Sequence, residues 1–405
     1  MSSLFTSRRA RALAGATALT ALVALSACDF GPDNDKDILT LAGSDTTQDV
    51  MQNIAGQYNA DPTYNNNPDD GGIDDADDLY NVLSVQSSAL NVPGDEHAGA
   101  RVWHTPPGAG EVASPNGSGA GRDALKASVI AGDGFVDIAR SSAGPRPVGS
   151  GTGQDPASFE YYAYALDAVG VSTASTLAPA NLTLAQLQGI YNCTFTNWNQ
   201  VGGSSGAIER YWPQAGSGTR SFAQSDLLGF DPTTISSGSC PAVTLTQENS
   251  GQTIAANGDQ QTAVVPYSAA NWVAQARGTA PDQRSGQLMH SLNGQSPVRQ
   301  VSGQFQLAVR NSSFPTAPVA EANVALNDPT PAYPGIRYVF NVISSESPSY
   351  TSAIRYVGFT NADKGETAPL CSGKYATTLS NYGFGPLDTT TGGTNLAGST
   401  CRRFS

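Results

Sequence analysis

The feature that most constrains the fold of this chain is a short polar loop, rich in Gly, Ser and Thr, that recurs after predicted strands. Four segments have this character: 43–46, 116–122, 139–142 and 215–220. Strands are predicted at 38–41, 135–139 and 161–172, and helices at 47–58, 122–131 and 183–191, the last with Thr183 as N-cap. This alternation of strands and helices predicts an α/β fold with a mainly parallel sheet.

The composition of these loops favours anion binding. A helix that begins after such a loop offers free N–H groups and the positive end of its dipole. Gly lets the main chain approach a ligand closely, Ser and Thr supply hydroxyl donors, and Arg supplies a fork of N–H groups. One such loop is more often a helix cap than a site. Because a tetrahedral oxyanion accepts about a dozen hydrogen bonds, four loops of one type predict convergence on a single ion.

The charge balance excludes some classes of partner. The 405 residues include 34 acidic and 21 basic side chains, which gives a net charge of −13. This balance disfavours a nucleic-acid-binding protein, although local dipoles and Arg side chains still allow anion binding. The acidic run between Asp69 and Asp78 does not have the EF-hand spacing, so we interpret it as a solvated loop rather than a calcium site.

The N-terminal segment is typical of an export signal. Three Arg residues precede an apolar run over 12–27, which is too short for an ordinary membrane span. The run ends in Leu-Ser-Ala followed by Cys28, which resembles the lipobox of a bacterial lipoprotein. We therefore expect a signal peptide over 1–27, lipid on Cys28 and a tether over 28–37; the alternative is a plain secretory signal with a chance Cys. No later segment is apolar enough to cross a membrane.

Export places the other cysteines in an oxidising compartment. Four remain after Cys28, and they permit three pairings. We favour Cys193–Cys240 and Cys371–Cys401, because each pair closes a moderate loop within one region. A zinc site is the alternative, but no pair has close ligand spacing and no His lies near a Cys. We expect neither a metal nor a cofactor.

The order of the polar loops resembles the PstS-like phosphate-binding proteins of bacterial ABC transporters, a branch of the type 2 periplasmic-binding-protein family. The resemblance covers about 38–360, with insertions near 61–115 and 230–260. The segments that carry it are 39–46, 117–119, 136–142, 184–191, 196–203, 216–220 and 333–339. The Asn-Trp pair at 197–198 and Gly-Ser-Gly-Thr-Arg at 216–220 are the most specific of them.

The resemblance implies an α/β fold with two lobes joined by crossing segments and a ligand cleft between them. Lobe 1 would span 38–160 with 330–405, and lobe 2 would span 161–329. It implies no catalysis. The protein would be a lipid-anchored monomer on the outer face of the bacterial cell membrane, would close around inorganic phosphate, and would dock on a permease whose ATPase is a separate chain.

The resemblance also implies a ligand site. The residues expected to bind the anion are Ser44, Asp45, Thr46, Ser118, Gly119, Arg140, Ser141, Ser142, Ser217, Gly218, Thr219 and Arg220. The sequence departs from the family pattern twice: Ser142 stands where many members have Asp, and Pro213 stands where many have Arg. Arg140 and Arg220 could supply the missing positive charge.

The missing carboxylate matters because it would accept the proton that phosphate keeps at neutral pH and sulfate lacks. We hypothesise that Asp45 takes over this role, with Arg140 balancing its charge. The alternative is that Asp45 caps the helix that begins near Thr47.

Other functions remain open on the sequence alone. The ligand could be sulfate, molybdate or another oxyanion. A secreted hydrolase is disfavoured because no Gly-x-Ser-x-Gly motif exists and no His lies beside a motif Ser. A surface scaffold that reuses the fold is the third alternative.

Overall fold

The fold is described from a computed structural model of the whole chain. It describes residues 38–61, 81–86, 102–104, 111–308, 333–358, 368–387 and 401–404. The predicted signal peptide, Cys28, the tether and the acidic run between Asp69 and Asp78 lie outside these ranges, as does most of the 61–115 insertion.

One mixed sheet organises the described chain, and its strands follow the order β2-β1-β5-β14-β6-β10-β8-β9. These strands are β1 (Ile38–Gly43), β2 (Asn81–Ser84), β5 (Ile138–Ser141), β6 (Phe159–Thr173), β8 (Glu209–Pro213), β9 (Thr244–Thr246), β10 (Ala263–Ser268) and β14 (Ile336–Ser344). Shorter strands are β3 (Val102–His104), β4 (Glu111–Ala113), β7 (Asn181–Leu182), β11 (Leu288–Leu292), β12 (Val298–Val301), β13 (Gln304–Leu307), β15 (Gly385–Pro386) and β16 (Arg402–Phe404).

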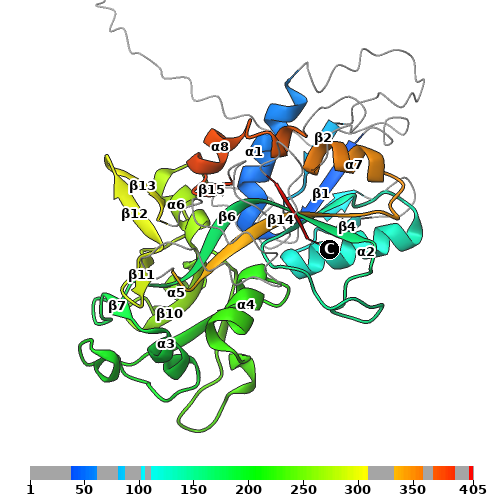
Figure 1. Cartoon of the computed structure of the whole chain (residues 1–405). Coiled ribbons are helices and arrows are strands. Elements are labelled where there is room, and N and C mark those ends of the chain that lie inside the picture. The colour runs from blue at the N-terminus through cyan, green and yellow to red at the C-terminus, as the bar shows by residue number, and fades with distance from the viewer. Residues whose placement is uncertain are drawn as a thin grey trace, which may run out of the picture. The chain divides into compact units, whose positions relative to one another are not determined.

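The sheet is parallel towards its two ends and antiparallel in its middle, so the expectation of a mainly parallel sheet is only partly met. β1 pairs in parallel with β2 and β5, and β8 pairs in parallel with β10 and β9. The central strand β6 runs antiparallel to both β14 and β10. The reason is that the chain crosses between the two ends of the sheet in β6, every residue of which is buried, and returns along it in β14. Figure 1 shows these two strands side by side.

Helices flank the sheet. They are α1 (Gln48–Asn59), α2 (Ser118–Ala131), α3 (Leu184–Tyr191), α4 (Gly218–Phe222), α5 (Gln252–Asn257), α6 (Ala269–Arg277), α7 (Tyr350–Val357) and α8 (Ala376–Asn381). The short helices are η2 (Asp45–Thr47), η3 (Trp198–Val201), η4 (Ala223–Leu228), η5 (Pro232–Thr234) and η6 (Pro369–Cys371); η4 is a π-helix that continues α4 and the others are 3₁₀. In Figure 1, α1, α2 and α7 lie beside β1 and β2, whereas α3 and α4 lie at the other end of β6.

Two helix N-termini show how local sequence places these elements. The predicted cap of α3 is confirmed, because Thr183 and Gln186 form a reciprocal capping box. Helix α2 begins at Ser118, four residues before the predicted start at Arg122. A Cβ on Gly121 would lie 2.5 Å from the Cα of Gly43, so the first turn of α2 packs directly on the end of β1. Close packing thus outweighs the low helix propensity of glycine.

Both predicted disulfides are present. Cys193 pairs with Cys240 across 47 residues, and Cys371 pairs with Cys401 across 30 residues. The zinc alternative is therefore wrong for these four cysteines. The first bridge ties the end of α3 to the segment before β9, and the second ties η6 to the segment before β16.

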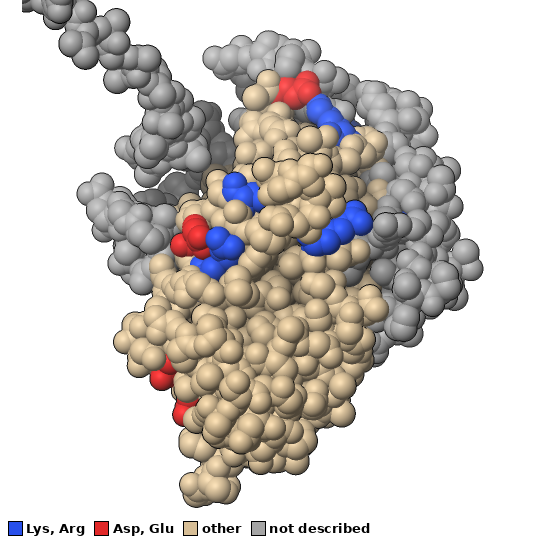
Figure 2. All heavy atoms as spheres, turned by 90° about the vertical axis from the view of Figure 1, so that its left-hand side faces the viewer, with Lys and Arg blue, Asp and Glu red and all other residues tan. Residues whose placement is uncertain are grey.

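The described surface carries few charges, in keeping with the 14% of charged residues in the sequence. On the face drawn in Figure 2, Lys, Arg, Asp and Glu side chains are scattered singly or in small groups over a largely uncharged surface. No helix within the described ranges is both long and apolar enough to cross a membrane.

Candidate functional site

The first three predicted loops meet through a chain of serine hydroxyls. Ser44 follows β1, Ser118 begins α2 and Ser142 follows β5, and all three side chains are buried. The Ser44 hydroxyl donates to Ser142 Oγ at 3.0 Å, and the Ser118 and Ser142 oxygens lie 3.2 Å apart. The main-chain N–H of Ser142 also donates to Ser118 Oγ at 2.9 Å. These three loops therefore meet in the structure, and their binding of a common anion stays a prediction.

The fourth loop, which follows β8, reaches the same cluster from the other end of the sheet. Gly119 donates its N–H to the carbonyl of Gly216 at 2.9 Å. A Cβ on Gly218 would lie 2.3 Å from the hydroxyl oxygens of both Ser118 and Ser142. Only glycine allows this approach, so Gly218 brings the start of α4 against the serine cluster.

Two threonines extend the cluster of hydroxyl groups. Thr46 and Thr219 come from the first and fourth loops, are both buried, and have their Oγ1 atoms 3.4 Å apart. Ser217 caps α4, because its Oγ accepts the N–H of Arg220 at 3.0 Å. Ser217 and Thr219 thus lie where the sequence analysis expects donors for an anion.

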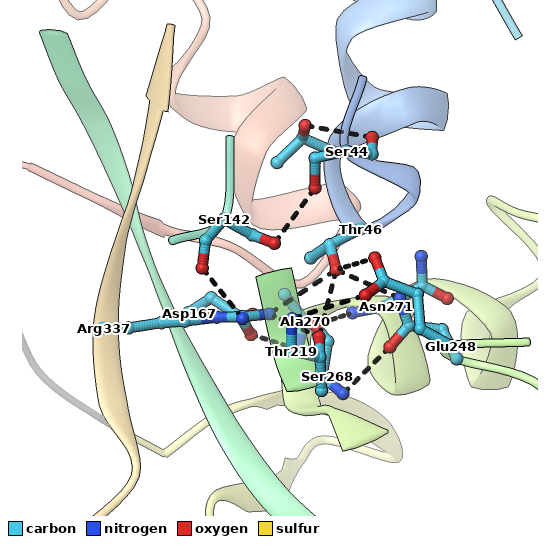
Figure 3. Close-up of polar contacts among 12 residues, drawn as sticks. Ser44, Thr46, Ser142, Asp167, Thr219, Glu248, Ser268, Ala270, Asn271 and Arg337 are labelled. Carbon is cyan, nitrogen blue, oxygen red and sulfur yellow. Dashed lines mark hydrogen bonds and ion pairs between the residues drawn. The ribbon is translucent and has the colours of Figure 1, made fainter. Parts of the chain in front are cut away.

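The centre of the cluster holds a guanidinium that the sequence analysis does not assign to the site. Arg337 lies on β14 and is 1% exposed. Its Nη2 donates to Thr219 Oγ1 at 3.0 Å and lies 3.5 Å from Thr46 Oγ1, and its Nη1 donates to the Ser142 carbonyl at 2.9 Å. Figure 3 shows Arg337 between these three residues. One buried cation therefore contacts residues of the first, third and fourth loops.

Asp167 on β6 balances the charge of Arg337. Its Oδ2 accepts Arg337 Nη2 at 2.8 Å and Nε at 3.0 Å, and the carboxylate is fully buried. It also accepts the Ser268 hydroxyl and the Ala270 N–H, each at 2.9 Å. These four hydrogen bonds satisfy the carboxylate and fix the plane of the guanidinium.

A second carboxylate enters the site from the loop after β9. Glu248 is 1% exposed and accepts the Thr46 hydroxyl at 3.1 Å through Oε1. Its Oε2 accepts the Thr219 N–H at 3.3 Å and the Ser217 hydroxyl. Glu248 lies in the 230–260 segment that the sequence analysis treats as an insertion, and it is thus a further site residue that the analysis missed.

The three site residues that were not predicted, Asp167, Arg337 and Glu248, have sequence contexts that could have identified them. Asp167 and Arg337 are charged residues in the middle of largely apolar sequence segments, and buried charges of this kind require partners. Glu248 belongs to the polar segment 247–251 between β9 and α5, which has the strand-loop-helix context of the predicted loops without their Gly-Ser/Thr composition.

The two arginines that the sequence analysis assigns to the ligand lie elsewhere. Arg140 is fully buried behind the first loop, where Nη1 donates to the Leu41 carbonyl at 3.1 Å and to Ser84 Oγ at 2.7 Å. Burial lowers the pKa of Arg140 to about 10, and the charge of Asp45 opposes that shift. Arg220 Nη1 donates to the Pro213 carbonyl at 3.4 Å, and Nη2 lies 3.9 Å from Asp231. These contacts tie Arg140 and Arg220 to groups next to the first and fourth loops. Arg337, which contacts the hydroxyl groups themselves, is therefore favoured as the cation of the site.

Two further predicted site residues, Ser141 and Asp45, form their side-chain hydrogen bonds with groups outside the hydroxyl cluster. The Ser141 hydroxyl donates to the Ala143 carbonyl at 2.7 Å. Asp45 is 3% exposed and accepts the side-chain amides of Gln214, at 3.2 Å, and Gln247. The N-cap of α1 is Thr47, and Asp45 lies inside the preceding 3₁₀ turn, so the helix-capping alternative for Asp45 is wrong. Its role as proton acceptor stays a prediction.

The electrostatic balance of the cluster is negative. Its buried formal charges are the guanidinium of Arg337 against the carboxylates of Asp167 and Glu248, while Arg140 and Asp45 lie buried beside the cluster with opposite charges. Main-chain N–H groups and hydroxyls must therefore carry much of the stabilisation of any bound anion. Across the described ranges, no group of three or more His, Cys, Asp or Glu side chains is placed to hold a metal ion.

The arrangement offers a group of hydrogen-bond donors. The hydroxyls of Ser44, Ser118 and Ser142 contact one another, and no hydrogen bond joins them to a His among the side chains that the structure describes. His290 instead places Nδ1 3.0 Å from the Pro179 carbonyl, and burial lowers its pKa. The chemistry that fits this geometry is hydrogen bonding to an oxyanion.

Solved structures of phosphate-binding proteins are similar to this chain. An ABC-type phosphate transport receptor from Vibrio cholerae is 18% identical, with 86% of this chain and 99% of that chain covered and a TM-score of 0.44. PstS from Borrelia burgdorferi is 16% identical, with 87% and 100% covered and a TM-score of 0.40. A phosphate-binding protein from Stenotrophomonas maltophilia is 14% identical, with 87% and 91% covered and a TM-score of 0.45.

No curated protein matched the chain. The family model of the PBP superfamily domain matches residues 31–281, which is more than half of the chain. With its mixed α/β sheet and crossing strands, the chain belongs to the PBP superfamily and has the two-lobed fold of the periplasmic binding proteins.

Proposed function

We propose that this protein is an extracytoplasmic solute-binding protein that captures inorganic phosphate for an ABC importer. The observation that carries the proposal is the convergence of buried Ser and Thr hydroxyls from the ends of β1, β5 and β8 around the guanidinium of Arg337. Burial strengthens each of these donors, since water does not compete for them.

Arg337 supplies a cation at the position where the sequence leaves one unassigned. The resemblance places an arginine where this chain has Pro213, and the loss of that cation would weaken any anion site. Arg337 brings a guanidinium to the same hydroxyls from β14, and Asp167 holds its plane. Asp167, Thr219 and the Ser142 carbonyl accept four of the five N–H groups of the guanidinium, so Arg337 would act on a bound anion mainly through its charge and through the remaining N–H of Nη1.

Selection of phosphate over sulfate requires an acceptor for the phosphate proton, and a carboxylate is the strongest choice because it also repels sulfate. We propose that Asp45 is that acceptor, since it lies buried between Ser44 and Thr46 at the end of β1. Its carboxylate accepts the side-chain amides of Gln214 and Gln247, and we expect it to accept the proton of phosphate as well.

The proposed lobes are 38–160 with 330–405 and 161–329. Under this division β6 and β14 lie along the boundary, and contacts such as Thr46–Thr219 and Gly119–Gly216 join one lobe to the other. A ligand bound among these residues would touch both lobes, and its binding energy would favour the closed state.

The proposed partners follow from the family and from the N-terminus. The protein would dock on a permease whose ATPase is a separate chain, act as a monomer, and stay at the membrane through lipid on Cys28. A single acyl chain binds a membrane only marginally, so the anchor requires more than one chain. Full membrane association of a Cys28→Ala variant would contradict this part of the proposal.

Calorimetric titration of the mature protein with phosphate, sulfate and molybdate tests the proposed function. We expect one phosphate per chain and weaker binding of the other two anions. Tighter binding of sulfate or molybdate would assign another oxyanion, and no binding of any of the three would contradict anion capture.

A further inference from the structure

The main chain of Glu248 is held in place by the pairing of two parallel strands. β9 pairs in parallel with β8, so the segment after Thr246 emerges at the same edge of the sheet as the loop after Pro213. Gln214 joins the two segments, because its N–H donates to the Thr246 carbonyl at 2.9 Å and its Oε1 accepts the Glu248 N–H at 2.7 Å. The main chain of Glu248 is therefore held beside the loop that carries Ser217 and Thr219.

The carboxylate of Glu248 uses the donors that the proposed anion needs. It accepts the hydroxyls of Thr46 and Ser217 and the N–H of Thr219, which come from the loops after β1 and β8. Figure 3 shows Glu248 facing Thr46 and Thr219. Each hydroxyl carries one proton, and each N–H has one as well, so none of these groups donates fully to Glu248 and to a bound anion at once.

The charge of Glu248 is met by these donors rather than by a cation. No ion pair joins it to a Lys or Arg within the described residues, and the guanidinium of Arg337 lies against Asp167. A buried carboxylate surrounded by hydroxyl and N–H donors has the same requirements as a bound oxyanion. The site is therefore built around a negative group that the chain itself supplies.

We infer that Glu248 is an internal anion, which occupies part of the site in the ligand-free protein and is displaced by the incoming oxyanion. This inference rests on the proposed function. It makes Glu248 a residue that sets affinity, because every oxyanion must break the contacts of the carboxylate with Thr46, Ser217 and Thr219. It also links the two loops in the absence of ligand, because the carboxylate bonds to both.

The test is titration of the wild-type protein and a Glu248→Ala variant with phosphate and with sulfate. Removal of the internal anion should strengthen binding of both anions, each by roughly ten- to hundredfold, the equivalent of one charged hydrogen bond. A Glu248→Gln variant keeps the size of the side chain and removes its charge, so it should change both affinities in the same direction and by less. The Glu248→Gln variant provides the test if the alanine variant does not fold.

The matched control is Glu209→Gln, because Glu209 is an exposed glutamate on β8 outside the cluster, and its change should leave both affinities as they are. Weaker phosphate binding with stronger sulfate binding in the Glu248 variants would overturn the inference and make Glu248 a proton acceptor. Unchanged affinities would overturn it and leave the proposed function standing. No binding by the wild type or by any variant would overturn the proposed function itself.

Discussion

Replacement of Arg337 by glutamine should impair both stability and anion binding, and the two effects are separable. The Arg337–Asp167 pair is 2.8 Å long, and its side chains are 2% and 0% exposed. Breaking a buried pair by removing one partner costs about 3–5 kcal/mol, because the other charge stays buried without compensation. Two hydrogen bonds, from Ser268 and Ala270, remain to Asp167, so we expect the lower part of this range.

The same substitution should weaken phosphate binding by roughly ten- to hundredfold, which is the loss of about one charged hydrogen bond. The second change, Asp167→Asn, separates the effects. In the double variant neither position of the pair carries a charge, so more than half of the lost stability should return. Anion affinity should stay low, since the cation is still missing. Urea unfolding measures the free energy of unfolding, and calorimetry measures binding.

The matched control is Arg284→Gln. Arg284 and Asp282 also form a pair of 2.8 Å, but their side chains are 20% and 52% exposed. An exposed pair of this length contributes about 1 kcal/mol or less. The reasoning is refuted if Arg337→Gln costs no more than this control, or if the double variant regains phosphate affinity together with stability.

Three further predictions concern other parts of the molecule. Asp45→Asn should weaken phosphate binding and allow sulfate to compete in the same titration; equal affinities before and after would exclude Asp45 as the proton acceptor. Burial raises the pKa of Asp137 from 3.8 to about 6, so the folded state keeps a proton that the unfolded state loses. The free energy of unfolding should therefore fall by about 2 kcal/mol from pH 4 to pH 6 relative to an Asp137→Asn variant, and parallel pH profiles would contradict this. Replacing Cys193 and Cys240 by serine opens a loop of 47 residues and should cost about 4 kcal/mol in urea unfolding, whereas an unchanged midpoint and slope would contradict the structural role of the bridge.

The loops that build the site were predictable because each carries its own local signal. Gly, Ser and Thr after an apolar strand identify the segments that hold Ser44, Ser118, Ser142 and Thr219 without knowledge of the fold. The export context likewise predicts disulfides among the four remaining cysteines, which allow three pairings. Proximity in sequence selects the pairing that the structure contains, with both of its bridges.

The cation of the site was not predictable in this way. Arg337 is 118 residues from Thr219 and 170 from Asp167, and only the return of β14 along β6 brings them together. Arg140, by contrast, follows the predicted pattern in sequence, yet its side chain points to the carbonyl of Leu41 behind the loop. A loop motif fixes where the main chain lies, whereas the direction of a long side chain depends on the packing around it.

Glu248 shows a second limit of local patterns. Its segment differs from the family pattern and is therefore interpreted as an insertion, although its parallel pairing with β8 places it in the site. Sheet order decides which strand ends are neighbours, and no spacing in the sequence between 213 and 246 encodes that β9 lies beside β8.

A crystal structure of the mature protein grown with phosphate tests the central claim most directly. The account predicts one phosphate within hydrogen-bond distance of the hydroxyls of Ser142 and Thr219 and of the guanidinium of Arg337, with the carboxylate of Glu248 moved from Ser217. A phosphate bound elsewhere, or a site in which Glu248 keeps its three contacts while phosphate saturates the protein in solution, would contradict it.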